Sequence, residues 1–228
     1  ETCIVEACEY KASFLTLSPD IGVLLNVDTD HLDYYKDLLG VEKGFNRFAR
    51  RISKDGFAVF NGDQIPYYIL KSVEAKCISY GFGKENDFRA CNLRQTKGLY
   101  SFEVDKFGKF YANAELRVRG KHNIYNALAT IVVCDLIGTD TKLCLEAINE
   151  FEGVERRWTQ IENGFTNIVE DYAHHPNEIR ALIETALQQE YGKVVVAFQP
   201  HTYSRTQALF NDFVTCFNGA DELMLLPI

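Results

Sequence analysis

Hydrophobic residues in the first part of the chain gather in short runs that polar residues interrupt. Residues 2–7 are predicted to form a strand, and the continuous apolar run over residues 21–27 is typical of a strand that is buried on both faces. Two further apolar runs, over residues 57–60 and 77–82, predict two more strands. Apolar residues recur at helical spacing over residues 35–52, which predicts an amphipathic helix between the strands. This order of strands and helices favours a mostly parallel sheet.

The pattern changes over residues 86–118, where apolar and polar residues alternate. Two alternating runs flank residues 105–108, which predicts a β-hairpin in an antiparallel patch. Strongly helical patterns follow over residues 122–137 and 141–151. The antiparallel patch is therefore expected to end before a pair of helices.

The second of these helices is expected to be capped by Thr139 or Thr141, since a hydroxyl can accept a hydrogen bond from the first turn. Gly153 then breaks the helical pattern, and the domain boundary is expected there. The sequence thus predicts one domain over residues 1–152 and another over residues 153–228.

The second domain resumes the alternation of strands and helices. Strands are expected over residues 165–170, 193–198 and 222–226, and a helix over residues 207–217. Pro176 is expected in the first turn of another helix, where its missing N–H group costs nothing. The predicted fold class is α/β, with a mostly parallel sheet plus an antiparallel patch followed by a Rossmann-like domain.

Composition and charge narrow the function. The 228 residues are 46% hydrophobic and carry a net charge of −8, which is typical of a globular protein and argues against a broad nucleic-acid-binding face. There is no apolar run of 18 residues, so no membrane insertion is expected. The seven cysteines include no Cys-x-x-Cys pair, which favours reduced, buried thiols in a cytoplasmic protein.

Polar side chains follow the first two predicted strands. Glu6 ends the first strand, and a carboxylate there can bind Mg²⁺ near a phosphate substrate, although a solvated acid is the simpler interpretation. His31 follows the second strand in a segment that imitates a calcium loop. That segment lacks the glycine at the sixth position and the glutamate at the twelfth, so it is not an EF-hand.

Other candidates lie at the starts of helices. Asn123 and Asn126 are three residues apart on one helical face, where two carboxamides can recognise the edge of an adenine, although capping and exposure explain them equally well. Arg157 can pair with a phosphate, or it is a surface residue at a hinge. His174 and His175 open a helix, where an anion is favoured, and a zinc site is not expected.

The carboxyl ends of the later strands present another polar rim. Asp171 follows one strand, and His201 and Arg205 follow the next, where ligands bind in open α/β sheets. Arg205 is a candidate clamp for a carboxylate or phosphate, although alone it is more often a surface residue. Two glycine-lysine segments, at 81–84 and 120–121, lack the spacing of a phosphate-binding loop.

Several strings of residues together resemble the Mur ligase family. The resemblance covers almost the whole chain, with a central ATP-binding domain followed by a C-terminal domain, and rests on residues 6–15, 26–33, 120–129, 153–157, 170–179 and 198–206. The strings at 170–179 and 198–206 resemble most the members that add L-alanine to UDP-N-acetylmuramate. The resemblance therefore implies an ATP-dependent ligase of peptidoglycan precursor synthesis that works through an acyl phosphate.

The resemblance also implies roles for single residues, carried over by motif position. Metal ligation is implied for Glu6 and His31, and adenine binding for Asn123 and Asn126. Asp171 corresponds to the acid that binds ribose. The implied catalytic residues are Arg157, on the phosphate side, with His174 and His175. The amino-acid pocket is expected near these histidines, with His201 and Arg205 binding substrate. The cofactors implied are ATP and Mg²⁺.

Departures from the family pattern limit these expectations. The family's phosphate loop and UDP-sugar domain are expected before residue 1 and its last strands after residue 228, so the 228 residues alone are expected to be inactive. Asn46 stands where several members carry a carbamylated lysine, so no carbamate is expected. Two alternatives remain, a ligase that recycles murein peptides and a nucleotide-binding fragment without turnover.

Overall fold

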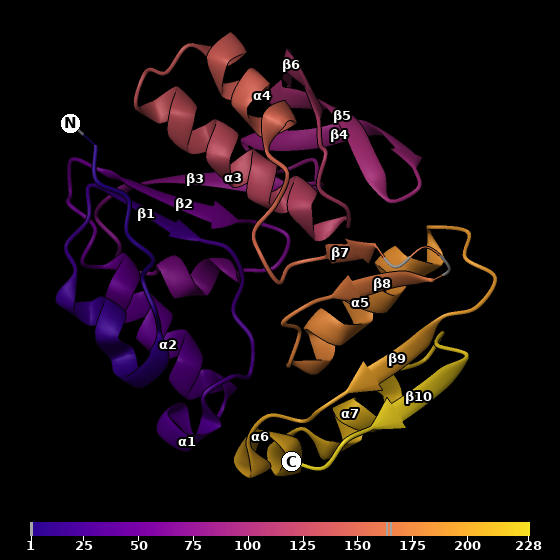
Figure 1. The fold of residues 1–228 in the computed structure, drawn as a ribbon. Coiled ribbons are helices and arrows are strands. Elements are labelled where there is room, and N and C mark those ends of the chain that lie inside the picture. Colours follow the sequence, from indigo (N-terminus) through magenta and orange to yellow (C-terminus); the bar gives the residue numbers. More distant parts are fainter. Residues whose placement is uncertain (1, 163, 165) are drawn as a thin grey trace. The chain divides into compact units, whose positions relative to one another are not determined.

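The computed structural model describes residues 2–162, 164 and 166–228, and the chain divides into two compact units (Figure 1). Unit 1 comprises Glu1–Cys91, Val104–Tyr111 and Leu128–Thr139, and unit 2 comprises Asn92–Glu103, Ala112–Ala127 and Asp140–Ile228. The two units interleave along the chain, so the boundary expected at Gly153 stays a prediction. Among the described helices, none is long and apolar enough to cross a membrane.

Six strands form one sheet in chain order, namely β1 (Ile21–Leu24), β2 (Phe57–Asn61), β3 (Lys76–Gly81), β4 (Phe88–Thr96), β5 (Leu99–Lys106) and β6 (Lys109–Glu115). The first four strands run parallel, with Val59 of β2 between Val23 and Ile78 of its neighbours. The last three are joined by the two-residue connections 97–98 and 107–108. All four connecting residues have positive φ, as in the type I′ turns of β-hairpins. The predicted parallel sheet with an antiparallel patch is confirmed.

The helices of unit 1 are η1 (Tyr10–Thr16), α1 (Leu32–Tyr35), α2 (Leu38–Ala49), η2 (Tyr67–Leu70) and the part of α3 (His122–Leu136) from Leu128 onward. The helix predicted over residues 35–52 is observed as α2, and it starts only at Leu38 because the extended backbone of Asp37 separates it from α1. The Asp37 carboxylate accepts a hydrogen bond from the Gly40 N–H over 2.7 Å and so starts a new helix.

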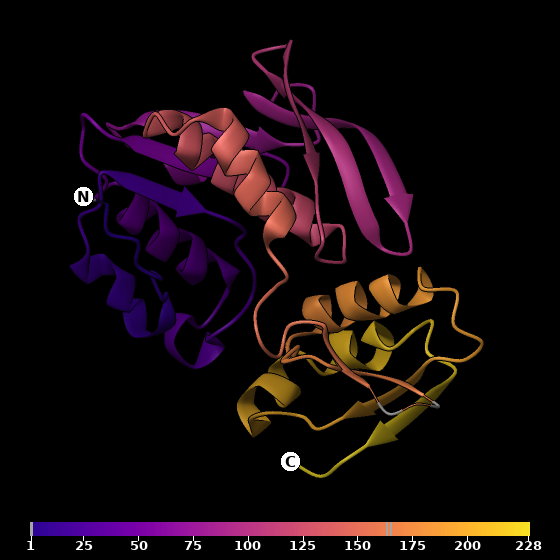
Figure 2. The same cartoon turned by 45° about the horizontal axis from the view of Figure 1, so that its top comes forward.

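The sheet of unit 1 is covered on both faces. α2 lies on one face of β1–β3 and α3 on the other (Figures 1 and 2). Ala58 and Val59 are adjacent in β2, point to opposite faces and are both fully buried. The continuous apolar runs of the sequence are explained by this arrangement, because a strand covered on both faces needs no polar side.

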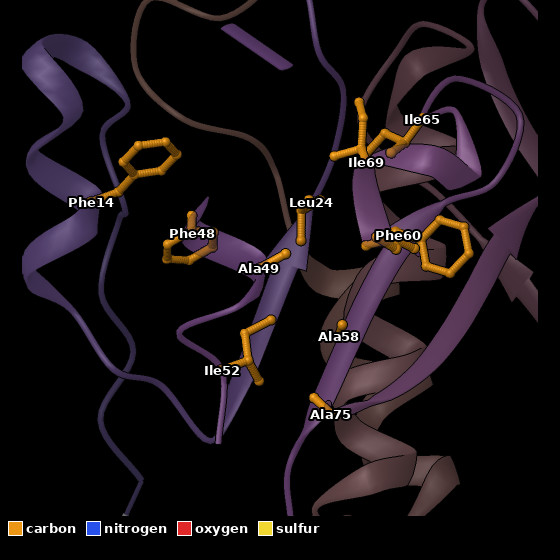
Figure 3. Close-up of a cluster of buried hydrophobic side chains, with 11 residues drawn as sticks. Phe14, Leu24, Phe48, Ala49, Ile52, Ala58, Phe60, Ile65, Ile69 and Ala75 are labelled. Carbon is orange, nitrogen blue, oxygen red and sulfur yellow. The ribbon is translucent and has the colours of Figure 1, made fainter. Parts of the chain in front are cut away.

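One hydrophobic core fills the space between α2 and the sheet, and Figure 3 shows its side chains. The rings of Phe14 and Phe48 stack with their centroids 5.0 Å apart, which attaches η1 to α2. Ile52 and Ala58 extend this core along the sheet. The core thus fixes the starting point of the loop that follows β1.

The strand predicted over residues 2–7 is wrong. Residues 2–9 form neither helix nor strand, and the Ile4 side chain is 92% exposed. A strand is stabilised by hydrogen bonds to a neighbouring strand, and among the described residues no strand pairs with this segment. β1 also ends at Leu24 rather than at residue 27.

Unit 2 contains the helices α4 (Thr141–Glu150), α5 (Pro176–Leu187), α6 (Tyr203–Ala208) and α7 (Phe210–Cys216) and the strands β7 (Thr159–Glu162), β8 (Asn167–Glu170), β9 (Val195–Phe198) and β10 (Glu222–Leu225). The cap of α4 is Asp140 rather than Thr139 or Thr141. Its carboxylate accepts hydrogen bonds from the N–H groups of Lys142 and Leu143 over 2.9 and 3.2 Å. Pro176 is the first residue of α5, as predicted.

The strands β7 to β10 form two separate pairs. β7 was not predicted from the sequence, and it pairs with β8 in antiparallel orientation, whereas β9 and β10 are parallel. The strand predicted over residues 165–170 is observed from Asn167 on, and Phe165 lies outside the described residues. The helix predicted over residues 207–217 is two helices that meet at Leu209.

The strand predicted over residues 193–198 is observed as β9, which is covered on one face only. Phe198 is buried, and its ring lies 5.8 Å from the ring of Phe213 in α7 and 5.2 Å from that of Phe217. α5 and α7 lie on the same side of the strands (Figure 2). The opposite side of β9 and β10 is exposed, Val195 and Met224 included.

Candidate functional site

His31 lies in the loop that follows β1, next to an acid from the segment before η1. Its Nε2 atom is 3.2 Å from the carboxylate of Glu9, and its ring is 4.8 Å from that of Tyr10. The His31 backbone has a φ of 54°, and its N–H donates to the Asp30 carboxylate over 2.7 Å. A non-glycine residue held in the left-handed region costs free energy, which makes this loop a candidate site.

Glu6 is exposed, and the strand that was expected to carry it toward His31 does not exist. The acids that the structure places against the His31 Nε2 atom are Glu9, at 3.2 Å, and Asp30, at 3.9 Å. Among the described residues, no three His, Cys, Asp or Glu side chains group closely enough to hold a metal ion alone. Mg²⁺ keeps several waters and needs only one or two protein carboxylates, so the chemistry of this loop fits it. The assignment of Glu6 and His31 as metal ligands stays a prediction.

Asn46, at the position compared with a carbamylated lysine, has a structural contact. Its side-chain amide donates to the carbonyl oxygens of Ile69 and Lys71 over 2.7 and 2.9 Å. These bonds attach α2 to the end of η2. The carboxamide thus satisfies two backbone acceptors at this position.

Asn123 and Asn126 lie side by side on the first turns of α3, as predicted from their spacing. The Asn126 amide donates to the side-chain oxygen of Asn123 over 3.0 Å, and the Asn123 amide donates to the Arg119 carbonyl over 2.7 Å. Asn126 is exposed and Asn123 is partly buried. The pair is therefore held in a fixed orientation, with the Asn126 side facing solvent.

Asp171 follows β8 and accepts hydrogen bonds with both oxygens. One oxygen accepts from the Trp158 N–H over 2.8 Å and the other from the Ala173 N–H over 2.8 Å. The carboxylate thus joins the loop before β7 to the turn before α5. A carboxylate oxygen has two lone pairs, so these bonds leave acceptor capacity for a ligand hydroxyl.

Arg157 lies in a strained loop. Its neighbours Arg156 and Trp158 have φ values of 60° and 52°, a region that non-glycine residues rarely adopt. The indole N–H of Trp158 is buried and has no hydrogen-bond partner among the described residues. Strain and an unsatisfied donor both cost free energy, and such features gather at functional sites.

The guanidinium of Arg157 pairs with Glu178 in the first turn of α5. The Arg157 Nη1 atom is 3.4 Å from one carboxylate oxygen, and the other oxygen accepts from the N–H groups of His174 and His175 over 2.9 and 3.1 Å. Burial by itself raises the pKa of the Glu178 carboxyl. The hydrogen bonds from His174 and His175 and the charges of His174 and Arg157 outweigh burial, so this pKa lies below its usual value.

The two adjacent histidines have different environments. The His174 Nδ1 atom lies 2.9 Å from the Tyr172 carbonyl oxygen, which can only accept, so Nδ1 carries a hydrogen, and in the neutral ring the lone pair is on Nε2. His175 is 7% exposed and caps α5, accepting the Asn177 N–H on its Nδ1 over 3.3 Å. The observed role of His175 is capping, and a catalytic role for it stays a prediction.

The last two candidates lie beyond β9. His201 is exposed in the loop before α6, and Arg205 is partly buried within α6. Both belong to unit 2, as do Asn123, Asn126, Arg157, Asp171 and the two histidines, whereas Glu6 and His31 belong to unit 1. The residues expected to bind nucleotide and amino acid therefore lie in one unit, and those expected to bind the metal lie in the other.

Sequence reasoning missed the two acids that organise these groups, Glu9 and Glu178. Glu178 stands three residues after the N-cap His175, and an acid at that position is the signature of a capping box. Glu9 stands three residues after Glu6, so it belongs to the same motif. Both signals were present in strings that the resemblance already used.

Two models of protein-family domains match most of this chain. Residues 1–134 match the model of the Mur ligase middle domain, and residues 156–227 match that of the Mur ligase glutamate ligase domain. A curated UDP-N-acetylmuramate–L-alanine ligase of Caldanaerobacter subterraneus subsp. tengcongensis is 42% identical over 232 residues, covering 100% of this chain and 50% of its own length. The chain thus spans about half the length of the curated relatives it matches.

Solved structures show the same fold. The crystal structure of the UDP-N-acetylmuramate–alanine ligase of Thermotoga maritima has a TM-score of 0.76 at 30% identity and covers 95% of this chain and 48% of that one. The MurF ligase of Thermotoga maritima, solved in complex with ADP, has a TM-score of 0.76 at 18% identity over 94% of this chain and 50% of that one. The family models cover most of the chain, and the chain belongs to the Mur ligase family.

Proposed function

We propose that the whole protein is an ATP-dependent ligase that joins L-alanine to UDP-N-acetylmuramate in the cytoplasm, as a step of peptidoglycan precursor synthesis. The observation that carries this proposal is the arrangement at the start of α5, where Glu178 fixes both Arg157 and His174. A preorganised guanidinium of this kind stabilises the charge that develops when a phosphoryl group is transferred. The curated relative that matches this chain over the chain's full length is named a UDP-N-acetylmuramate–L-alanine ligase, which supports the proposed reaction.

The proposed reaction has two steps. A carboxylate oxygen of UDP-N-acetylmuramate bonds to the γ-phosphorus of ATP, the bond from that phosphorus to the β–γ bridging oxygen breaks, and ADP leaves. The amino group of L-alanine then attacks the carbonyl carbon of the acyl phosphate. The tetrahedral intermediate collapses to the amide, and inorganic phosphate leaves. Such a reaction depends on positioning and charge stabilisation more than on a protein nucleophile.

Each candidate side chain has a proposed part in these steps. Asn123 and Asn126 bind the adenine edge, and Asp171 accepts from a ribose hydroxyl. Arg157 binds the phosphate oxygens with its planar guanidinium. The Nε2 lone pair of His174 takes the proton that the amine loses, since its Nδ1–H is already held by Tyr172.

Two further groups complete the proposal. Arg205 and His201 bind the carboxylate of L-alanine, because a guanidinium matches a carboxylate with two parallel hydrogen bonds. Glu6 and His31 would hold Mg²⁺, with Glu9 next to the His31 ring. The bound ion would neutralise part of the phosphate charge. None of these protein groups forms a covalent bond to substrate.

The test is an assay of the full-length protein with ATP, Mg²⁺ and UDP-N-acetylmuramate, with and without L-alanine. We expect ADP, phosphate and UDP-N-acetylmuramoyl-L-alanine in equal amounts, and only when L-alanine is present. A product formed only from a ready-made murein peptide identifies the recycling ligase instead. Nucleotide binding without any turnover identifies a binding protein, and either outcome contradicts the proposal.

A further inference from the structure

The carboxylate of Glu178 makes contacts in two directions, and each of its oxygens has its own set of partners. Oε2 accepts the backbone N–H groups of His174 and His175 over 2.9 and 3.1 Å. Oε1 faces Arg157 Nη1 at 3.4 Å. A helix cap alone requires only the first set, so the contact with Arg157 is additional to capping.

We propose that Glu178 is a positioning residue of the ligase reaction, which holds the guanidinium of Arg157 and the turn of His174 and His175 in one arrangement. The proposal rests on the proposed function, because it assigns Glu178 to the phosphate side of the same site. Glu178 itself touches no reacting atom and acts through Arg157 and His174.

The surroundings of Arg157 explain why it needs such a partner. Its side chain is 53% exposed, and a long exposed side chain samples many rotamers. Its backbone is fixed by the strained loop between Arg156 and Trp158 and by the hydrogen bond from the Arg157 N–H to the Val154 carbonyl over 3.0 Å. Among the described residues, Glu178 is the only acid that pairs with its guanidinium within 4.0 Å.

A second carboxylate shows the contrast. Asp171 also joins the loop before β7 to the turn before α5, but both of its oxygens accept backbone N–H groups, from Trp158 and Ala173. Asp171 therefore fixes the backbone of the Arg157 loop, and Glu178 fixes the side chain. With both in place the guanidinium is directed before substrate binds, which lowers the entropy that binding must remove.

The variant E178Q separates the two roles of this side chain. A glutamine keeps a carbonyl oxygen that can accept from His174 and His175, so the cap of α5 is retained. It loses the charge that pairs with Arg157. If Glu178 only caps the helix, E178Q behaves as the parent does. If Glu178 positions Arg157, kcat/KM for ATP falls about tenfold or more, as expected for a lost charge-assisted contact.

The decisive experiment is a double-mutant cycle in the full-length protein. Initial rates of ADP formation are measured for the parent, E178Q, Arg157→Ala and the double variant at varied ATP. We expect E178Q to lower kcat/KM in the parent background and to change it less than about twofold in the Arg157→Ala background, because the residue through which Glu178 acts is then absent. Equal effects of E178Q in both backgrounds overturn the proposal.

Two variants control for folding. Asp140→Asn makes the same change of acid to amide at the cap of α4, at a residue with no part in the proposed reaction, and is expected to leave kcat/KM unchanged. Glu178→Asp keeps the charge and the cap, and is expected to recover part of the activity that E178Q loses. If Glu178→Asp is no more active than E178Q, charge is not what matters and the proposal is wrong. A parent without ligase activity contradicts the proposed function instead.

Discussion

The side-chain amide of Asn126 donates a hydrogen bond to the side-chain oxygen of Asn123 over 3.0 Å. Asn123 in turn donates to the Arg119 carbonyl in the segment before α3. The two carboxamides thus form a chain that begins at the backbone and ends at the exposed side of the helix. Since the inner member is anchored, the outer member has a defined orientation toward solvent.

This relationship predicts different effects for the two asparagines. Asn126→Ala removes one uncharged hydrogen-bonding group from the proposed adenine site, worth about 0.5–1.5 kcal/mol, so the dissociation constant for ADP is expected to rise about two- to twelvefold. Isothermal titration calorimetry with ADP measures it. Asn123→Ala is expected to weaken ADP binding at least as much, because it also removes the hydrogen-bond acceptor that orients the Asn126 side chain. The matched control is Asn113→Ala in β6, an exposed asparagine that is expected to leave ADP binding unchanged.

The loop after β1 gives a second prediction, on the metal. Glu6→Gln is expected to raise the Mg²⁺ concentration needed for half-maximal ADP formation by about tenfold or more, because a carboxylate ligand is lost. Glu9→Gln removes the partner of His31 and tests whether the observed pair matters equally. A large effect of Glu9→Gln together with none of Glu6→Gln moves the metal site to Glu9. Titrating Mg²⁺ at fixed ATP distinguishes these outcomes.

The acid titration of Glu178 gives a third prediction. Its pKa in the folded protein lies below the ordinary value of 4.5, so the native state binds fewer protons than the unfolded state in that window. The free energy of unfolding therefore rises with pH there, and the contribution of Glu178 is present above pH 4.5 and is lost as the pH falls through the folded-state pKa.

E178Q cannot titrate at this position. At about pH 7 its urea midpoint is expected to lie below that of the parent, and the difference is expected to shrink as the pH falls below the ordinary value of 4.5. Urea unfolding followed by circular dichroism at several pH values measures both curves. A difference that stays constant with pH means that the carboxylate has no lowered pKa.

The parts of the fold that were predicted correctly have strong local signals. β2 contains the apolar run 57–60, and the turn at Phe107 and Gly108 lies between alternating runs. Pro176 can stand only in the first turn of a helix, so the start of α5 was predicted correctly. In each of these cases the residues near the element determine it.

The errors have physical causes that lie beyond the local pattern. Residues 2–7 have the apolar character of a strand, but a strand depends on a partner that the local sequence does not specify. The break at Asp37 was missed because an apolar helical pattern continues across it, while a single carboxylate starts a new helix. The role of Glu178 depends on Arg157, which is 21 residues away in the chain.

Arg205 provides the last prediction. It lies in α6, just after the carboxyl end of β9, and is partly buried, which fits a guanidinium that forks onto the carboxylate of L-alanine. Lysine keeps the charge but cannot form the two parallel hydrogen bonds, and losing one charge-assisted contact costs about 1.5–3 kcal/mol. We therefore expect Arg205→Lys in the full-length protein to raise KM for L-alanine about ten- to a hundredfold, with little change in KM for ATP.

The matched control for Arg205→Lys is Arg94→Lys in β4, an exposed arginine in the antiparallel patch, which is expected to leave KM for L-alanine unchanged. Initial rates at varied L-alanine and saturating ATP measure the effect. An unchanged KM for L-alanine assigns Arg205 to the protein surface, and a rise in KM for ATP alone places it on the phosphate side, because the same guanidinium geometry fits phosphate oxygens equally well.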